Sequence, residues 1–349
     1  MSVNIKKLAE ELNLSISTVS RALKDSFEIS EATKVKVREM ALKLGYQPNP
    51  HASSLRGSSS RTIAVVIPEV ANNFFALAIN GIEYVAQEKG YHVLIYITHE
   101  DMKKEVEFVN HLQNGRVDGV LMSLSAGTDD YTHLVNLKEK GFPLIFFDRV
   151  CESIKGTYVV TDDFESGFAA TEHLVQMGCK RIAYLDLSKH LSISNKRMEG
   201  YYKALEKYGL KNDAAHVAEF TNDVAANEEI LENMLKGKGR PDGIFASVEK
   251  LAIAVYYVCE KLSISIPGDL KVIGFSNLEI SSLLHPSLTT ITQPAYEIGK
   301  QAALQLFRHI EKKHRAEAYE KIILKSTLIP RGSTRNDVKA DVVRKRFRK

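Results

Sequence analysis

Residues 15–21 are rich in hydrogen-bond donors and contain no acid, a composition that suits contact with nucleic acid. On a helix, Ser17, Ser20 and Arg21 fall on the side opposite Val19 and Ala22. An arginine reads guanine through its O6 and N7 atoms, while serine and threonine hydroxyls hold phosphates. The candidate DNA-binding residues in this stretch are Ser15, Ile16, Ser17, Thr18, Ser20 and Arg21. Among them, Ile16 lies at the border of the apolar face, where it either packs or touches a base.

A second set of polar residues follows short apolar runs farther along the chain. Asp148-Arg149 follows Leu144-Ile-Phe-Phe, Ser247 to Lys250 follows Ile244-Phe-Ala, and Ser276-Asn277 follows Ile273-Gly-Phe. Asn72-Asn-Phe-Phe follows the first such run, and Arg197 begins the run Arg-Met-Glu-Gly-Tyr on a predicted helix. Carboxylates and guanidiniums bind hydroxyls, while aromatic rings cover the apolar face of a sugar. The pattern predicts a polyol site, although each residue alone equally fits a solvated loop or a helix cap.

The elements that must carry the first set are three short helices. Asn4 caps a first helix with apolar positions Ile5, Leu8, Ala9 and Leu12, which ends at Asn13, and Ser15 caps a second. A third helix opens at Ser30, continues through Ala32, Val35, Met40, Ala41 and Leu44, and stops at Gly45. Together they predict a helix-turn-helix domain over residues 1–47. Spacing alone leaves open a small three-helix interaction domain whose polar face is simply solvated.

The elements that must carry the second set are alternating strands and helices over residues 62–330. The first series of predicted strands covers 63–67, 93–97, 119–122, 144–147 and 158–160, with helical periods such as 74–89 and 103–114. A second series covers 181–185, 216–218, 243–246 and 270–275. The predicted fold is α/β: a helical head and a body of two doubly wound parallel-sheet lobes. A ligand crevice is expected between the carboxyl ends of the strands.

Charge is distributed unevenly along the chain. Residues 1–61 carry 10 Lys/Arg against 6 Asp/Glu, residues 331–349 carry 8 against 2, and the stretch between them is acidic. A basic head on an acidic body fits a protein whose end approaches a polyanion. The tail, residues 331–349, is predicted to be disordered. Its basic cluster either adds sequence-independent attraction to DNA or is simply solvated.

Several classes of protein are disfavoured. No segment approaches the roughly 20 apolar residues that span a bilayer, and no export signal is evident, so a cytoplasmic protein is expected. The three cysteines form no C-x-x-C pair, the eleven histidines do not cluster, and no phosphate-binding or hydrolase motif occurs. We therefore expect no metal, no cofactor and no catalysis. Asp129-Asp130 and Asp162-Asp163 are interpreted as loop or cap residues without a basic partner. The alternatives are a plain sugar-binding protein and, more distantly, a sugar-modifying enzyme.

The N-terminal residues resemble the lactose-repressor/galactose-repressor (LacI/GalR) family. The resemblance rests on Ile5-Lys-Lys-Leu-Ala-Glu-Glu-Leu-Asn-Leu-Ser-Ile-Ser-Thr-Val-Ser-Arg-Ala-Leu, then Ile29-Ser-Glu-Ala-Thr and Leu44-Gly-Tyr-Gln-Pro-Asn-Pro. It implies that Ile16, Ser17 and Arg21 face bases and that Thr18 and Ser20 contact phosphates. Residues 48–61, which alone read as a flexible tether, would include a hinge helix that inserts Leu55 into the minor groove. Ser53 stands where family members commonly carry arginine.

The resemblance continues to about residue 330 through Phe147-Asp-Arg, Gly200-Tyr, Gly274-Phe and Leu284-His-Pro-Ser-Leu-Thr-Thr-Ile-Thr-Gln-Pro. It implies an effector domain similar to periplasmic sugar-binding proteins, with Phe74, Asp148 and Arg197 lining the pocket. The remaining predicted effector contacts are Asn73, Val248, Glu249 and Ser276. Val248-Glu249 replaces the usual Asn-Asp, and Ser276-Asn277 replaces Asp-Asp. A carboxylate missing at Ser276 would favour an acidic or phosphorylated ligand over a neutral hexose.

The function predicted from these features is that of a transcription regulator, most simply a repressor. A single head covers one half-site, so a homodimer on a pseudo-palindromic operator is expected. A sugar or sugar derivative bound between the lobes would change the relation of the lobes and hence the affinity for DNA. Release of DNA by the ligand is the expected polarity.

Overall fold

The computed structural model describes residues 4–23, 25–46, 59–112, 116–186, 188, 191–212, 216–220, 223–311 and 319–335. The contacts divide the chain into two compact units, Met1–Ser60 and Arg61–Lys349. The predicted hinge residue Leu55 lies outside the described residues, as do residues 336–349 of the predicted tail. Of the helices that are described, none is both long and apolar enough to cross a membrane.

The first unit is a bundle of three helices, α1 (Ile5–Leu12), α2 (Ile16–Leu23) and α3 (Glu31–Leu44). The predicted caps form: Asn4 accepts a hydrogen bond from the Lys7 amide, and Asn13 adopts the left-handed conformation that ends α1. The core comprises Leu8, Ala9, Val19, Ala22, Val37 and Ala41. Val37 and Ala41 of α3 are buried against α1 and α2, whereas Val35 is exposed.

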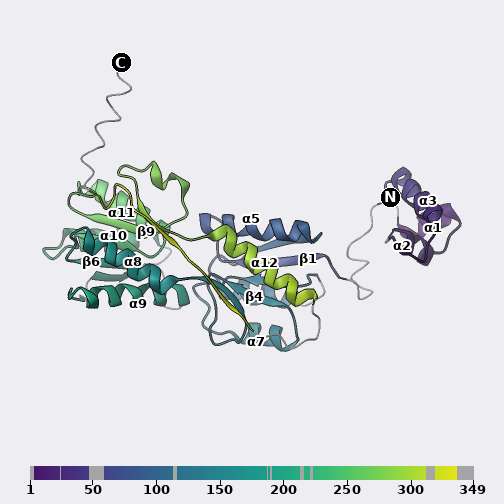
Figure 1. Ribbon diagram of the computed structural model, residues 1–349, viewed down its shortest axis with the longest axis horizontal. Coiled ribbons are helices and arrows are strands. Elements are labelled where there is room, and N and C mark those ends of the chain that lie inside the picture. The colour runs from purple at the N-terminus through teal and green to yellow at the C-terminus, as the bar shows by residue number, and fades with distance from the viewer. Residues whose placement is uncertain are drawn as a thin grey trace, which may run out of the picture. The chain divides into compact units, whose positions relative to one another are not determined.

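The second unit holds two six-stranded sheets, each covered by helices on both faces (Figure 1). All neighbouring strands of the first sheet are parallel. In order across the sheet the strands are β11 (Lys321–Leu324), β5 (Thr157–Thr161), β4 (Leu144–Phe147), β3 (Val120–Met122), β1 (Thr62–Ile67) and β2 (His92–Ile97). Alternate residues of β1 enter different cores. Ile63, Val65 and Ile67 pack under α5 (Asn73–Glu88) and α12 (Ala295–Glu311), and Ala64 and Val66 pack under α6 (Met102–Leu112) and α7 (Thr132–Glu139).

The second sheet is parallel except at one edge, where β12 runs antiparallel to β10. Its order is β12 (Thr327–Ile329), β10 (Thr289–Thr292), β9 (Lys271–Phe275), β8 (Gly243–Ala246), β6 (Ile182–Asp186) and β7 (Val217–Glu219). Helices α8 (Asp163–Gln176) and α9 (Ser192–Lys207) cover one face. Helices α10 (Val224–Lys236) and α11 (Glu249–Lys261) cover the other. The predicted class of two doubly wound lobes is confirmed.

The two series of predicted strands implied that each lobe is one continuous half of the chain. In the structure the lobes are not continuous. After β10, the chain returns to the first lobe as α12, which lies beside α5 (Figure 1). It then adds β11 to the first sheet and β12 to the second. The strands β11 and β12 were not predicted because each has only three or four residues and none of their side chains is fully buried.

The prediction that the chain is disordered from residue 331 onward is wrong for residues 331–335. Ser333 and Thr334 are fully buried beside β10. The Ser333 hydroxyl accepts a hydrogen bond from the Thr289 amide at 2.8 Å and donates to the Val272 carbonyl at 2.6 Å. Because these hydroxyls satisfy backbone groups that would otherwise be buried without partners, residues 331–335 belong to the second lobe.

Candidate functional site

The predicted DNA-reading residues lie on and just before α2, mostly in contact with solvent. Ser15, Ile16, Ser17 and Arg21 are exposed, and Thr18 and Ser20 are partly exposed. Ile16 is 39% exposed, which excludes the expectation that it packs into the core. Val19 and Ala22 on the opposite side are fully buried, so the fold fixes which face of α2 is free to meet a partner.

Hydrogen bonds and ion pairs hold this surface in place. The Ser15 hydroxyl accepts from the Thr18 amide at 3.1 Å, which caps α2. Arg21 forms an ion pair with Glu28, with 2.8 Å between Nη1 and Oε2, in an exposed position. Because such exposed pairs contribute little to stability, Arg21 can exchange this partner for another acceptor at small cost.

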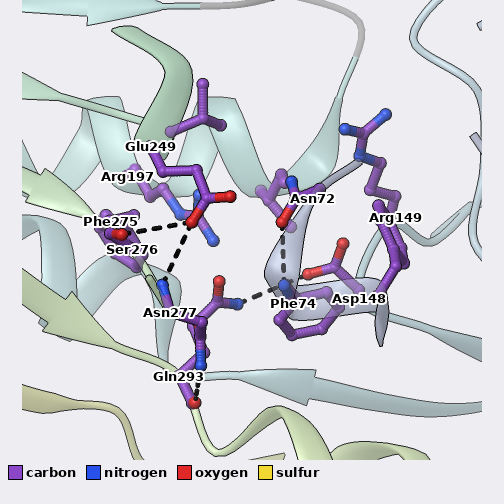
Figure 2. Close-up of a pocket in the computed structure, with 13 residues that line it drawn as sticks. Asn72, Phe74, Asp148, Arg149, Arg197, Glu249, Phe275, Ser276, Asn277 and Gln293 are labelled. Atoms are coloured by element: carbon purple, nitrogen blue, oxygen red, sulfur yellow. Dashed lines mark hydrogen bonds between the residues drawn. The ribbon is translucent and has the colours of Figure 1, made fainter. Parts of the chain in front are cut away.

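A pocket lies where the carboxyl ends of the strands in the two sheets meet (Figure 2). The space between its side chains amounts to about 370 Å³, part of it open to solvent. Six of the seven predicted effector contacts line it: Phe74, Asp148, Arg197, Val248, Glu249 and Ser276. Other lining residues include Asn72, Phe75, Arg149, Ile193, Phe275, Asn277 and Gln293. That these residues contact an effector stays a prediction.

The seventh residue, Asn73, is not among those that line the pocket. Its amide donates to Glu249 Oε1 at 3.3 Å, and its Nδ2 donates to the Asn277 carbonyl at 3.5 Å. Asn73 is on α5 of the first lobe, whereas Glu249 and Asn277 belong to the second. Asn73 thus makes an interlobe contact, and its role as an effector contact stays a prediction. Its neighbour Asn72, which caps α5, lines the pocket.

Arg197 is the most constrained cation of the pocket. Its side chain is 2% exposed, and its guanidinium stacks on the Phe275 ring at 3.7 Å. Nε donates to Asp163 Oδ1 at 2.8 Å and Nη1 donates to the Ser247 carbonyl at 2.7 Å. Nη2 is buried with no hydrogen-bond partner among the described residues. A buried donor of this kind calls for an acceptor, which a ligand in the pocket would supply.

The partner of Arg197 contradicts the interpretation of Asp162-Asp163 as acids without a basic partner. Asp163 opens α8, and Gly167, one turn later, lets α9 approach so closely that a Cβ there would lie 2.3 Å from the Arg197 carbonyl oxygen. Burial raises the pKa of Asp163, and the Arg197 guanidinium opposes that rise. The sequence could not place Arg197 beside Asp163 because the two residues belong to different helices.

Asp148 is the acid of the first lobe that lines the pocket. It follows β4 in a left-handed conformation, with φ of 59°, and is 6% exposed. Burial raises the pKa of Asp148 to about 6, although Arg149 and Arg197 oppose the rise. Gln293 Nε2 lies 3.5 Å from Asp148 Oδ1 and 3.3 Å from Thr161 Oγ1. The signal for Gln293 in the sequence is its position directly after the β-branched run Thr289–Thr292, which is β10.

Glu249 lies beside Ser276, the position at which the sequence analysis noted a missing carboxylate. Its Oε2 accepts from the Ser276 hydroxyl at 3.2 Å and from the Asn277 amide at 3.4 Å (Figure 2). A carboxylate from the start of α11 thus lies next to Ser276, and the charge of the ligand stays a prediction. Burial raises the pKa of Glu249, and the hydrogen bond from the Asn73 amide opposes that rise.

The remaining acidic candidates are Asp129 and Asp130. In the described part of the chain, no group of three or more His, Cys, Asp or Glu is arranged to hold a metal ion. Asp130 accepts from the amide and hydroxyl of Thr132 at the start of α7, as expected of a residue near a helix cap.

Comparison with known proteins places both units. Residues 4–49 match the family model of bacterial regulatory proteins of the lacI family, and residues 60–331 match that of periplasmic binding proteins and the sugar binding domain of the LacI family. The chain is 28% identical to the HTH-type transcriptional repressor CytR of Escherichia coli K12, over 96% of this chain and 97% of that protein.

Two solved structures are also similar. A structure of the lac repressor dimer bound to operator and the anti-inducer ONPF superposes with a TM-score of 0.83 at 21% identity, covering 96% of this chain and 99% of that one. A LacI family regulator from Enterococcus faecium with bound ribose superposes with a TM-score of 0.69 at 28% identity, covering 78% of this chain and 98% of that one. The first likeness concerns the fold alone.

Proposed function

Because the chain belongs to the lacI family of bacterial regulatory proteins, we propose that it is a repressor whose affinity for operator DNA is controlled by a sugar or sugar derivative bound between its two lobes. As a member of this family it is a DNA-binding transcription regulator and not an enzyme. The name of CytR as a repressor and the ribose in the Enterococcus faecium regulator support the finer proposal.

The observation that carries the effector proposal is the state of Arg197. A guanidinium that is buried, stacked on an aromatic ring and left with one unpartnered nitrogen is suited to an oxygen acceptor of a ligand. Asp148 on the first lobe would accept ligand hydroxyls, and Phe74 would cover an apolar face of the sugar. A ligand held in this way touches both lobes and can therefore favour one relation between them over another.

For DNA, we propose that Ser17, Arg21 and Ile16 meet base edges and that Ser15, Thr18 and Ser20 contact phosphates. A homodimer on a pseudo-palindromic operator follows from the size of a single head, which covers one half-site. The proposed role of Leu55 in the minor groove concerns a residue outside the described ranges. Ligand binding is proposed to release the operator.

Two steps test this function. Selection from random duplexes first identifies the preferred operator, and fluorescence anisotropy then measures its affinity with and without a panel of neutral sugars that includes ribose. We expect one sugar to weaken operator binding. The Arg197→Gln variant should bind the operator equally well without sugar and respond less to it. Equal affinities with and without every sugar would contradict effector control.

A further inference from the structure

Asp163 is a buried acid that does not line the pocket itself but pairs directly with Arg197, which does. Both side chains of the pair are 2% exposed, and 2.8 Å separates Asp163 Oδ1 from Arg197 Nε. The guanidinium has one further acceptor, the neutral carbonyl of Ser247. Asp163 is therefore the carboxylate that pairs directly with Arg197, at a place where solvent screening is weak.

The second cation of the pocket is neutralised in the same way. Arg149 Nη1 lies 2.8 Å and 3.0 Å from the two carboxylate oxygens of Glu100, and both side chains are largely buried. Two more carboxylates, Asp148 and Glu249, belong to the lining itself. Among the described residues around the pocket, each guanidinium thus has its own carboxylate, and no cation is left over to compensate an anionic ligand.

We propose that Asp163 sets the charge class of the effector: by neutralising Arg197 it makes the pocket accept an uncharged oxygen, such as a hydroxyl or carbonyl, at Nη2 and reject a phosphate or carboxylate. This inference rests on the proposed function, because it concerns the ligand of the same pocket. A hydroxyl oxygen satisfies Nη2 without adding charge. An anionic group at that place would share the pocket with the carboxylates of Asp148 and Glu249, while Asp163 already balances the charge of Arg197.

The chain offers a matched control in the preceding residue. Asp162 is also an acid at the start of α8, and its Oδ1 accepts from the Ser166 hydroxyl at 3.0 Å and from the Ser326 amide at 2.8 Å. These hydrogen bonds hold the chain locally and do not involve Arg197. Asp162→Asn and Asp163→Asn therefore remove the same charge from adjacent positions, and only the second leaves Arg197 uncompensated.

Isothermal titration calorimetry with sodium sulfate, at an ionic strength held constant with NaCl, measures the affinity of the pocket for an anion. We expect Asp163→Asn to bind sulfate at least tenfold more tightly than the wild type and Asp162→Asn. The double variant Asp163→Asn with Arg197→Gln should lose that gain. Equal sulfate affinities for Asp162→Asn and Asp163→Asn, or a gain that survives the loss of Arg197, would overturn the proposal. A purely structural role of Asp163 predicts no gain at all.

A second measurement needs only the wild-type protein. Titration with ribose and with ribose 5-phosphate compares an uncharged ligand with its anionic ester. The proposal requires tighter binding of ribose, and a phosphate ester bound at least tenfold more tightly would overturn it even if Asp163→Asn fails to fold. Failure of the proposed function would appear differently, as operator binding that no sugar changes, while the sulfate titration still reports the effect of Asp163 on Arg197.

Discussion

At the scale of single residues, the most specific prediction concerns Arg21 on the exposed surface of α2. Replacing Arg21 by alanine should cost about 1–3 kcal/mol in binding to the preferred operator and should reduce discrimination against scrambled duplex, because a guanidinium that reads a base edge is lost. Fluorescence anisotropy with both duplexes measures the two effects.

Arg38→Ala is the matched control for Arg21→Ala. Arg38 is an arginine of the same head, paired with Asp25 at 2.8 Å, but it belongs to α3. Its loss should change binding to the two duplexes by similar amounts. If Arg38→Ala relaxes sequence discrimination as much as Arg21→Ala does, α2 is not the element that reads the bases.

The raised pKa of Asp148 makes the stability of the fold depend on pH. Its pKa is about 6 in the folded chain and returns toward 3.8 on unfolding, so between these values the folded state binds more protons and stability falls as the pH rises. Asp148→Asn should therefore be more stable than the wild type at pH 8, by at most about 3 kcal/mol, and no more stable near pH 3.5. Urea unfolding at the two pH values measures the difference.

Asp130 provides the opposite sign for comparison. It is exposed, and hydrogen bonds from Thr132 lower its pKa, so its ionised form stabilises the fold. Asp130→Asn should be less stable than the wild type at pH 8, with the difference shrinking in acid. An Asp148→Asn variant with the same sign as Asp130→Asn would show that burial does not disfavour the Asp148 carboxylate.

At the scale of elements, glycines set the distance between paired helices. A Cβ at Gly299 of α12 would lie 1.9 Å from the Ala78 carbonyl oxygen of α5, and the helices must separate to admit it. Gly299→Ala should destabilise the second unit by roughly 1–3 kcal/mol. Thermal and urea unfolding measure this loss.

Gly237→Ala tests whether the effect comes from crowding. Gly237 ends α10, and the nearest heavy atom to an added Cβ is 3.7 Å away, an ordinary contact distance. We expect little change in stability at this position. Equal losses at Gly237 and Gly299 would indicate a general effect of replacing glycine and not the close approach of α5 and α12.

The sequence predicted most helices and strands but not how they pack against one another. Strong periodicity located α1 to α3 and the strands from β1 to β9, and strand ends indicated Asp148, Glu249 and Ser276. Periodicity describes one segment at a time, so it could not assign α12 to the first lobe. For the same reason it could not bring Asp163 to Arg197 or Glu249 to Ser276, since those contacts depend on how separate helices and strands pack.

At the scale of the whole molecule, the two compact units imply that the second can act alone. A fragment of residues 61–349 keeps both sheets, the cores around them and all residues that line the pocket. It should unfold cooperatively and bind the same sugar with an affinity within about threefold of that of the full chain, while losing operator binding. Calorimetry and anisotropy measure these properties. A fragment that binds no sugar while the full chain does would show that the first unit contributes to the pocket.

Because α12 belongs to the first lobe but is translated after most of the second, the first lobe cannot complete its core early in translation. Ala295, Ile298, Ala302, Leu306 and Phe307 of α12 fill the core beneath β1 and α5, which are synthesised more than two hundred residues earlier. Until α12 emerges, the apolar residues of β1 and α5 that it covers lack this partner, and we expect chaperones to shield them. A premature stop codon near residue 290 would therefore remove part of the core of the first lobe, although most of that lobe had already been translated.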